Sequence, residues 1–464
     1  MLERLLLVLM CSFAVNTAAH AAAQYDLRKP GLAAIINDAP LSLRLVAVMQ
    51  KIAAGREPGI SKAAVLHALL EDRLIAAHAR ASFPADELIE NNKVGYTPAV
   101  QLEQALVADL QAAFGDRISQ SVEQKKGGNL DTLVRSRHEL AAADWIAVFG
   151  ARPGMLLEYA LSEQGRAAAA KIDVLTYRLG KRPAVKVSLL DVYDAQNVQG
   201  RHQLHDHDAA FAMQQAELLL ERQYVLYWAQ SRSGLSAPEY AVLKQIVADR
   251  LVTEGWLATI GVANDIHADN AHLKALAAAA SAEEIRHYYD LNRDQFLRVE
   301  KVHARHISLA DEAAADAVYA RLEKGEGFAA LARSNSLAGD REQGGDLGWL
   351  LHGDKAASWM ESLAFVQKPQ VPSRPFRSPG KPGENPAWEI LLVDERVEGY
   401  QPADSESVRY VAANAIAKIK VQEEYRETRE HLWREADIHI APALQPEVKP
   451  VATPVLHPGK GPLL

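Results

Sequence analysis

The segment from residue 299 to residue 400 constrains the fold more than any other part of this 464-residue chain. It begins with the stretch VEKVHARHISLA, whose alternation predicts a half-buried strand through His306, and it ends with AWEILLV, which predicts a central strand. A helical pattern and the glycine-rich turn GGDLGW at residues 344–349 lie between the two. The composition changes near Phe296, so we expect a separate domain to begin there.

The first 23 residues have the pattern of a cleavable secretory signal peptide. Arg4 stands in a short polar start, an apolar run covers residues 5–15, and small residues lead up to Ala23. The run is too short for a permanent membrane-spanning helix, which needs about 20 residues. The only cysteine, Cys11, lies in this segment, so the remaining chain can form neither a disulfide nor a thiolate. These features favour secretion into an oxidising compartment.

Residues 24–295 consist mainly of amphipathic helical patterns. Apolar residues recur at helical spacing after Ser61. Capping boxes at Ser236 and Ser281 mark two further helix starts, because a hydroxyl and a carboxylate three residues apart satisfy the first free amides of a helix. Over residues 100–180 we expect short helices joined by loops. This region is therefore expected to form a helical scaffold.

Three further segments complete the expected organisation. Residues 184–192 alternate well enough to predict a strand. A final helix is expected from residue 405 to residue 437, within an element at residues 405–440 that packs on the helical scaffold. Residues 441–464 contain a proline at regular intervals and show no core pattern, so we expect a disordered proline-rich tail.

Residues 297–400 resemble the parvulin family of peptidyl-prolyl cis-trans isomerases. Six pieces match in order, namely ARHI around His306, GEGFAALA from Gly325, the Ser336 loop, GGDLGW, MESLAF and WEILLVD. The resemblance implies a four-stranded antiparallel sheet surrounded by helices, with a proline-binding site on one sheet face. Neither a metal nor another cofactor is expected, because rotation about an X-Pro bond breaks no covalent bond. The expected fold class is α+β, a mostly helical chaperone-like scaffold that carries this parvulin domain.

The resemblance also implies a candidate site. Its polar centre falls on His306, and its substrate-binding pocket falls on Leu347, Leu350, Met360 and Phe365. Burial statistics alone would assign these four apolar residues to an ordinary core. The ordered match with the family favours the pocket instead.

Two positions depart from the family pattern. Glu389 stands in the last strand where active parvulins usually carry a second histidine. The loop after the GEGFAALA helix is slightly short, which places the family's acidic or cysteine position near Ala338, with Asp340 as a candidate substitute. A carboxylate at Glu389 could accept a hydrogen bond from His306 and raise the pKa of the histidine. His306 and Glu389 are therefore the candidate catalytic residues.

The segments that flank the parvulin domain resemble those of SurA-like periplasmic folding factors. The similarity lies in the stretch IINDAPLS from Ile35, the helix SAEEIRHYYD from Ser281 and the long helix after the domain. In that family the flanking helices form a chaperone domain that binds extended clients. The expected function is isomerisation of X-Pro bonds in secreted polypeptides, assisting their folding in the periplasm. The alternative is a non-catalytic periplasmic chaperone or assembly factor whose parvulin module only binds peptide.

Other classes of partner have less support. Lys and Arg number 51 against 59 Asp and Glu, and phosphate binding needs a basic face, so no nucleic acid is expected. No apolar run after the first segment is long enough for stable membrane insertion. His202, His205, His207 and Asp208 form a cluster that could bind zinc or copper, or could lie in a solvated loop before a helix. The expected partners are unfolded or extended proline-containing client polypeptides.

Overall fold

A computed structural model describes residues 23–89, 94–151, 158–263, 269–352, 359–379 and 386–446. The described chain divides into two compact units, one made of residues 23–275 and 418–446, the other of residues 276–417. Nearly all of the expected signal peptide, and residues 447–464 of the expected tail, lie outside the described residues. No helix in the described ranges is long and apolar enough to cross a membrane.

The first unit is mainly helical, and its buried apolar side chains form one large core that draws on most of its helices and a second, smaller cluster. Its helices are α1 (Leu43–Ala54), α2 (Lys62–Ser82), α3 (Ala85–Leu88), α4 (Pro98–Glu123), α5 (Ala142–Phe149), α6 (Glu163–Ala169), α7 (Leu189–Asp194), α8 (Val198–His205), α9 (Ala209–Arg232) and α10 (Ala237–Ile260). The expected capping box at Ser236 is confirmed at the start of α10. Helix α11 (Ala271–Ala278) and helix α16 (Glu406–Glu435) each belong partly to this unit and partly to the second.

Two small antiparallel sheets complete the first unit. One has the order β10-β1-β2 and joins β1 (Leu32–Ile36) and β2 (Ala39–Ser42) to β10 (Ile438–Ile440). The pairing of β1 with β10 brings the two ends of the described chain into one sheet. The other sheet has the order β3-β4-β5 and contains β3 (Val134–Arg137), β4 (Asp173–Tyr177) and β5 (Val185–Ser188).

The structure corrects several local expectations for this unit. The expectation of short helices joined by loops over residues 100–180 is met by α5 and α6 alone, because residues up to Glu123 belong to the single long helix α4 and the strands β3 and β4 lie in the same range. The strand expected at residues 184–192 ends at Ser188, whose side chain caps α7. Residues 442–444 form a short 3-10 helix that buries Leu444, so the first residues of the expected tail pack on the core.

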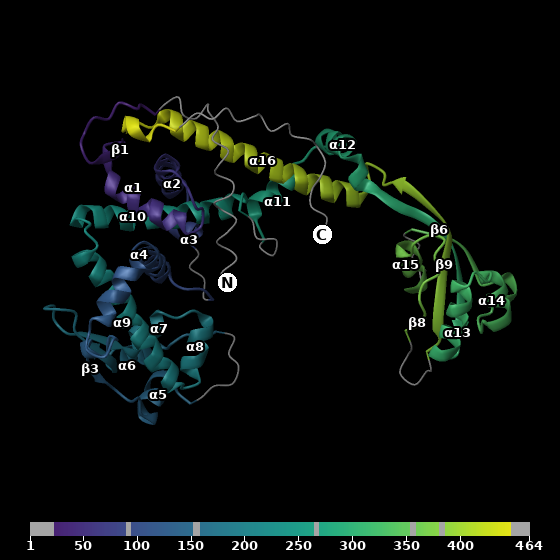
Figure 1. The fold of residues 1–464 in the computed structure, drawn as a ribbon, viewed down its shortest axis with the longest axis horizontal. Coiled ribbons are helices and arrows are strands. Elements are labelled where there is room, and N and C mark those ends of the chain that lie inside the picture. The colour runs from purple at the N-terminus through teal and green to yellow at the C-terminus, as the bar shows by residue number, and fades with distance from the viewer. Residues whose placement is uncertain are drawn as a thin grey trace. The chain divides into compact units, whose positions relative to one another are not determined.

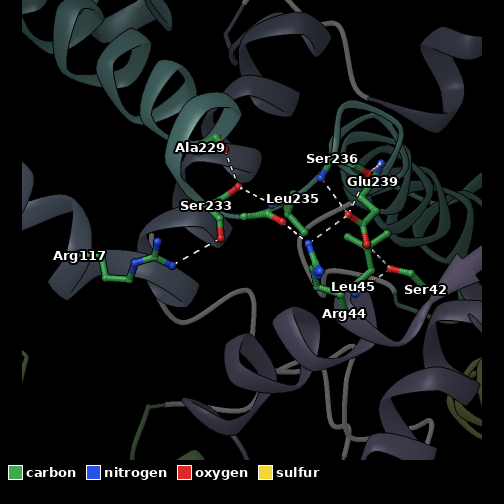
Figure 2. Close-up of polar contacts among 10 residues, drawn as sticks. Ser42, Arg44, Leu45, Arg117, Ala229, Ser233, Leu235, Ser236 and Glu239 are labelled. Atoms are coloured by element: carbon green, nitrogen blue, oxygen red, sulfur yellow. Dashed lines mark hydrogen bonds and ion pairs between the residues drawn. The ribbon is translucent and has the colours of Figure 1, made fainter. Parts of the chain in front are cut away.

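A polar junction connects the turn between α9 and α10 to the start of α1, as Figure 2 shows. The Glu239 carboxylate accepts hydrogen bonds from the Ser236 amide at 2.8 Å and from the Ser236 hydroxyl at 2.9 Å, within the capping box of α10. It also accepts a hydrogen bond at 2.8 Å from the hydroxyl of Ser42, the N-cap of α1. Arg44 donates to the Gly234 carbonyl in the turn. One carboxylate thus links the N-termini of two helices that are far apart in sequence.

Buried carboxylates also join α2 to α10 and α16. Asp249 on α10 pairs with Arg80 at 2.6 Å and with Arg73 at 3.3 Å, both on α2. Glu71 on α2 pairs with Arg429 on α16 at 2.8 Å. Buried carboxylates are costly without such partners. These ion pairs therefore favour one arrangement of the three helices within the first unit.

The second unit is a four-stranded antiparallel sheet with helices on both faces. Its strands have the order β7-β6-β9-β8 and are β6 (Leu297–Leu309), β7 (Asp346–Leu351), β8 (Phe376–Arg377) and β9 (Trp388–Tyr400). The two long central strands pair from Leu297 opposite Tyr400 to Leu309 opposite Trp388. The helices are α12 (Ala282–Leu291), α13 (Glu312–Glu323), α14 (Phe328–Asn335) and α15 (Trp359–Val366). The expected α+β fold class is confirmed, including the antiparallel four-stranded sheet.

Each face of this sheet has its own apolar cluster. Ile307 and Ile390 lie on one face and pack against apolar residues of α13 and α14. Val302 and Leu391 lie on the opposite face and pack against Met360 and other residues of α15. Figure 1 shows α13 and α14 on one side of the paired strands β6 and β9, and α15 on the other. The α15 face carries the candidate site.

Candidate active site

The two candidate catalytic residues lie on the α15 face of the sheet. In the register of the central strands, His306 lies opposite Leu391 and Ser308 lies opposite Glu389. Side chains two residues apart on a strand share a face, so Glu389 is on the same face as the buried Leu391. Because residues directly opposite each other on neighbouring strands also share a face, His306 lies on that face too.

His306 is held between two carboxylates. Its Nδ1 lies 3.0 Å from Oε2 of Glu389, and its Nε2 lies 2.9 Å from Oδ2 of Asp340. The side chains of His306 and Glu389 are 12% and 6% exposed, whereas that of Asp340 is 24% exposed. The sequence offered Asp340 only as a candidate substitute for the family's acidic or cysteine position. In the structure it is Asp340 that contacts His306. The hydrogen bond expected between His306 and Glu389 is present.

The two carboxylates also set the charge of the imidazole. Burial by itself lowers the pKa of His306, because desolvation disfavours the charged form. The hydrogen bonds and negative charges of Glu389 and Asp340 act in the opposite direction and outweigh it, so that the pKa of His306 is raised above its ordinary value. A protonated imidazole can donate one hydrogen bond to each carboxylate. The site therefore favours a charged histidine fixed on both sides.

Gly345 of the glycine-rich turn allows the loop and strand β7 to pack against His306. Its backbone has φ +73°, and a Cβ at this position would lie 2.0 Å from the carbonyl oxygen of His306. The Gly345 carbonyl accepts a hydrogen bond from the His306 amide at 2.8 Å, and the Gly345 amide donates to the Asp340 carbonyl at 3.1 Å. Glycine at this position thus connects the Asp340 loop to the histidine strand.

The four candidate pocket residues belong to one apolar cluster on the same face. Met360 is buried, and Leu347, Leu350 and Phe365 are partly buried against it. Two further aromatic residues that the sequence did not single out, Trp359 and Phe376, pack in this cluster with their rings 5.9 Å apart and edge to face. The sequence gives no sign of this packing beyond the aromatic character of Trp359 in a helix and of Phe376 in an edge strand. The face therefore combines an apolar cluster with a charged centre.

The other histidines that the sequence singled out, or that share strand β6, lie apart from this site. His303 lies on β6 away from this centre, with its ring nitrogens 3.3 Å from carboxylate oxygens of Asp346 and Asp394. His205 is buried among aromatic rings, and its centroid lies 4.9 Å from that of Phe149. Among the described residues no group of three or more His, Cys, Asp or Glu side chains could hold a metal ion, which includes the cluster at residues 202–208.

Comparison with known proteins identifies the second unit. Residues 280–409 match the model of the PPIC-type PPIase domain. The foldase protein PrsA of Caldanaerobacter subterraneus is 41% identical over 97 residues, which are 21% of this chain and 30% of that protein. The chaperone SurA of Thiobacillus denitrificans is 28% identical over 158 residues, covering 32% of this chain and 34% of that protein. The periplasmic chaperone PpiD of Haemophilus influenzae is 32% identical over 187 residues, covering 32% and 28% of the two chains.

The matching part of the chain is a parvulin-type peptidyl-prolyl isomerase domain. Over this part the chain is similar to proteins named PrsA, SurA and PpiD, which confirms the expected resemblance of residues 297–400 to parvulins. The matches span about a third to a half of the length of the first curated relatives. The solved structure of PrsA from Bacillus subtilis is 20% identical and covers 50% of this chain and 75% of that chain, with a TM-score of 0.18.

Proposed function

We propose that this protein is a peptidyl-prolyl cis-trans isomerase that acts on X-Pro bonds of secreted polypeptides and assists their folding in the periplasm. One observation carries the proposal: the fixed histidine and its two carboxylates share a sheet face with the apolar cluster around Met360. Such a face can hold a proline ring beside a charged group. The PPIC-type match of residues 280–409 supports the same activity.

The reaction requires rotation about the X-Pro amide and no covalent chemistry. Amide resonance gives this rotation a barrier of about 18–20 kcal/mol, and it also places negative charge on the carbonyl oxygen. Twisting the amide removes that charge separation. An enzyme accelerates the rotation if it stabilises the twisted amide more than the planar one. An apolar contact for the ring and a suitably placed charge near the carbonyl are sufficient for this purpose.

The residues of this site divide the task. Leu347, Met360 and Phe365 form the apolar contact for the proline ring. Asp340 has the most exposed side chain of the three polar residues, and its buried Oδ1 has no hydrogen-bond partner among the described residues, so we assign this carboxylate the position next to the client amide. A negative charge beside the carbonyl oxygen disfavours the planar, charge-separated amide and lowers the barrier to rotation. His306 holds the Asp340 carboxylate in position, and Glu389 keeps His306 protonated.

A proline-limited refolding assay tests this function. The wild-type chain is expected to accelerate the slow phase, and His306→Ala is expected to reduce the acceleration severalfold because the Asp340 loop loses its anchor. Glu389→His introduces the usual family residue, whose neutral ring can still accept a hydrogen bond from His306 but no longer adds a negative charge, so it is expected to retain part of the activity. If all three proteins leave the slow phase at its uncatalysed rate of tens of seconds or longer, the proposed activity is excluded.

A non-catalytic chaperone is the second candidate, and Glu389 in place of a family histidine is the observation that favours it. A chaperone that only binds peptide would suppress aggregation of an unfolded client without accelerating isomerisation. Both activities are therefore measured on the same preparation. Aggregation suppression that persists in His306→Ala, together with no isomerase activity in the wild type, would favour the chaperone. Periplasmic location is part of the proposal and rests on the signal-peptide pattern and on the relative named a periplasmic chaperone.

A further inference from the structure

A cleft of about 510 Å³ lies in the first unit, in the size range of sites that bind ligands. It is lined by α4, α7, α9 and strand β5. Apolar side chains make up part of its lining, namely Val100, Leu179, Val187 and Leu219. None of its lining residues belongs to the site around His306, which is in the other unit. We call this feature the β5 cleft.

The acidic groups of the β5 cleft already have partners. Glu103 accepts a hydrogen bond from Gln223 at 2.9 Å. Asp194 forms two hydrogen bonds with Arg166, at 3.0 and 2.8 Å. Asp191 accepts hydrogen bonds from the amide and hydroxyl of Ser188 at the start of α7. These carboxylates are therefore poorly available to a cationic ligand.

Within the part of the chain that the structure describes, two arginines of the cleft have no acidic partner. Arg182 donates a hydrogen bond to the neutral Gln230 at 2.9 Å, and its guanidinium lies 4.9 Å from the ring centroid of Tyr227. The side chain of Arg222 forms neither a hydrogen bond nor an ion pair within the described ranges of the chain. The third cation, Lys186, pairs with Asp173 at 2.5 Å. The lining carries three carboxylates and three cations, so its formal charges balance. The cleft nevertheless combines apolar surface with two arginines that lack a carboxylate partner within hydrogen-bond distance, and these two can pair with acidic groups.

Strand β5 adds a backbone surface to the cleft. It is an edge of the sheet β3-β4-β5, and it pairs with β4 along one side only among the described residues. Val185, Lys186 and Val187 of this strand all line the cleft. The free side of an edge strand offers amide and carbonyl groups to an extended segment. In such a segment, alternate side chains point in opposite directions.

We propose that the β5 cleft is a second polypeptide-binding site, which takes an extended segment that alternates acidic and apolar side chains. The backbone of the segment pairs with β5, its apolar side chains contact the lining around Val187 and Leu219, and its carboxylates pair with Arg182 and Arg222. This site goes beyond the isomerase function and does not depend on it. It requires no proline in the bound segment.

A fluorescence anisotropy measurement on the full chain tests this site. The probe is a labelled proline-free peptide that alternates Glu and Val, compared with a matched peptide that alternates Lys and Val. We expect the Glu peptide to bind at least tenfold more tightly, because opposite charge on the two arginines favours it. We also expect methylation of alternate backbone nitrogens, which blocks strand pairing, to weaken binding of the Glu peptide severalfold.

Charge-reversal variants locate the binding. The double variant Arg182→Glu/Arg222→Glu is expected to bind the Glu peptide at least tenfold more weakly than the wild type. The control variant Arg135→Glu/Arg232→Glu changes the net charge by the same amount at exposed positions outside the cleft, so it is expected to keep the wild-type affinity. Thermal unfolding verifies that both variants fold. His306→Ala should bind like the wild type. Equal binding of the Glu and Lys peptides, equal losses in the two double variants, or loss of binding in His306→Ala would each overturn the proposal.

Discussion

Replacing Gly345 by alanine probes how the glycine turn supports the candidate site. The added Cβ would lie 2.0 Å from the carbonyl oxygen of His306, so the two backbones must separate by about 1 Å to reach the shortest contacts that occur. Alanine in the left-handed region costs about 1–2 kcal/mol, and forced overpacking costs a further 1–3 kcal/mol. We therefore expect Gly345→Ala to destabilise the parvulin domain by about 2–5 kcal/mol.

The neighbouring Gly339 provides a matched control. A Cβ there meets no atom within 4 Å, and its backbone is outside the left-handed region. Gly339→Ala is therefore expected to change stability by less than about 0.5 kcal/mol. Urea unfolding gives the free energies, and hydrogen exchange of the β6 amides reports the domain itself. Equal unfolding free energies for Gly345→Ala and Gly339→Ala would refute the reasoning about close backbone approach.

Three further predictions concern the first unit. Glu239→Gln should lower the free energy of unfolding by about 1–2 kcal/mol at pH 7, as measured by urea unfolding. Hydrogen bonding from Ser236 lowers the pKa of Glu239, so the stabilisation by its carboxylate is lost as the pH falls through that pKa. The difference between the variant and the wild type should therefore shrink in acid. Asp249→Ala should cost about 2–3 kcal/mol by the same measurement, because it leaves Arg73 and Arg80 without their buried partner. Burial raises the pKa of Asp72 to about 7, so ionisation of this carboxyl group increasingly destabilises the fold as the pH rises from 4 through 7. Asp72→Asn should therefore raise the melting temperature at pH 8 and leave it nearly unchanged at pH 4. An equal effect of Asp72→Asn at both pH values, or a pH-independent deficit in Glu239→Gln, would contradict these assignments.

The sequence predicted the parvulin domain well because its constraints are local and specific. The alternation around His306 and the AWEILLV stretch correspond to β6 and β9, the two central strands. The GGDLGW turn contains the close approach that only glycine permits. The contact between His306 and Glu389 could be predicted because Glu389 stands in the last strand where the family usually carries a histidine, and a carboxylate there can accept a hydrogen bond. Each inference depended on a pattern within a few residues.

The parts that were missed depend on contacts between distant segments. The conformation of the loop before the glycine turn decides whether Asp340 reaches His306, and no periodic pattern reports that conformation. Strand β3 has the sequence VRSR and lacks an apolar alternation, so only its pairing with β4 makes it a strand. Strand β10 has three residues and pairs with β1 at the other end of the described chain. Propensity could not indicate any of these contacts.

Exchange spectroscopy by NMR on a short Ala-Pro peptide is the most direct measurement of the central claim. Catalytic amounts of the wild-type chain are expected to produce exchange cross-peaks between the cis and trans forms on the one-second timescale, where the uncatalysed peptide shows none. His306→Ala, with its fold verified independently, is expected to weaken them severalfold. Absence of cross-peaks with the folded wild-type chain, or undiminished cross-peaks with His306→Ala, would contradict the assignment of isomerase activity to the face that carries His306, Asp340 and Glu389.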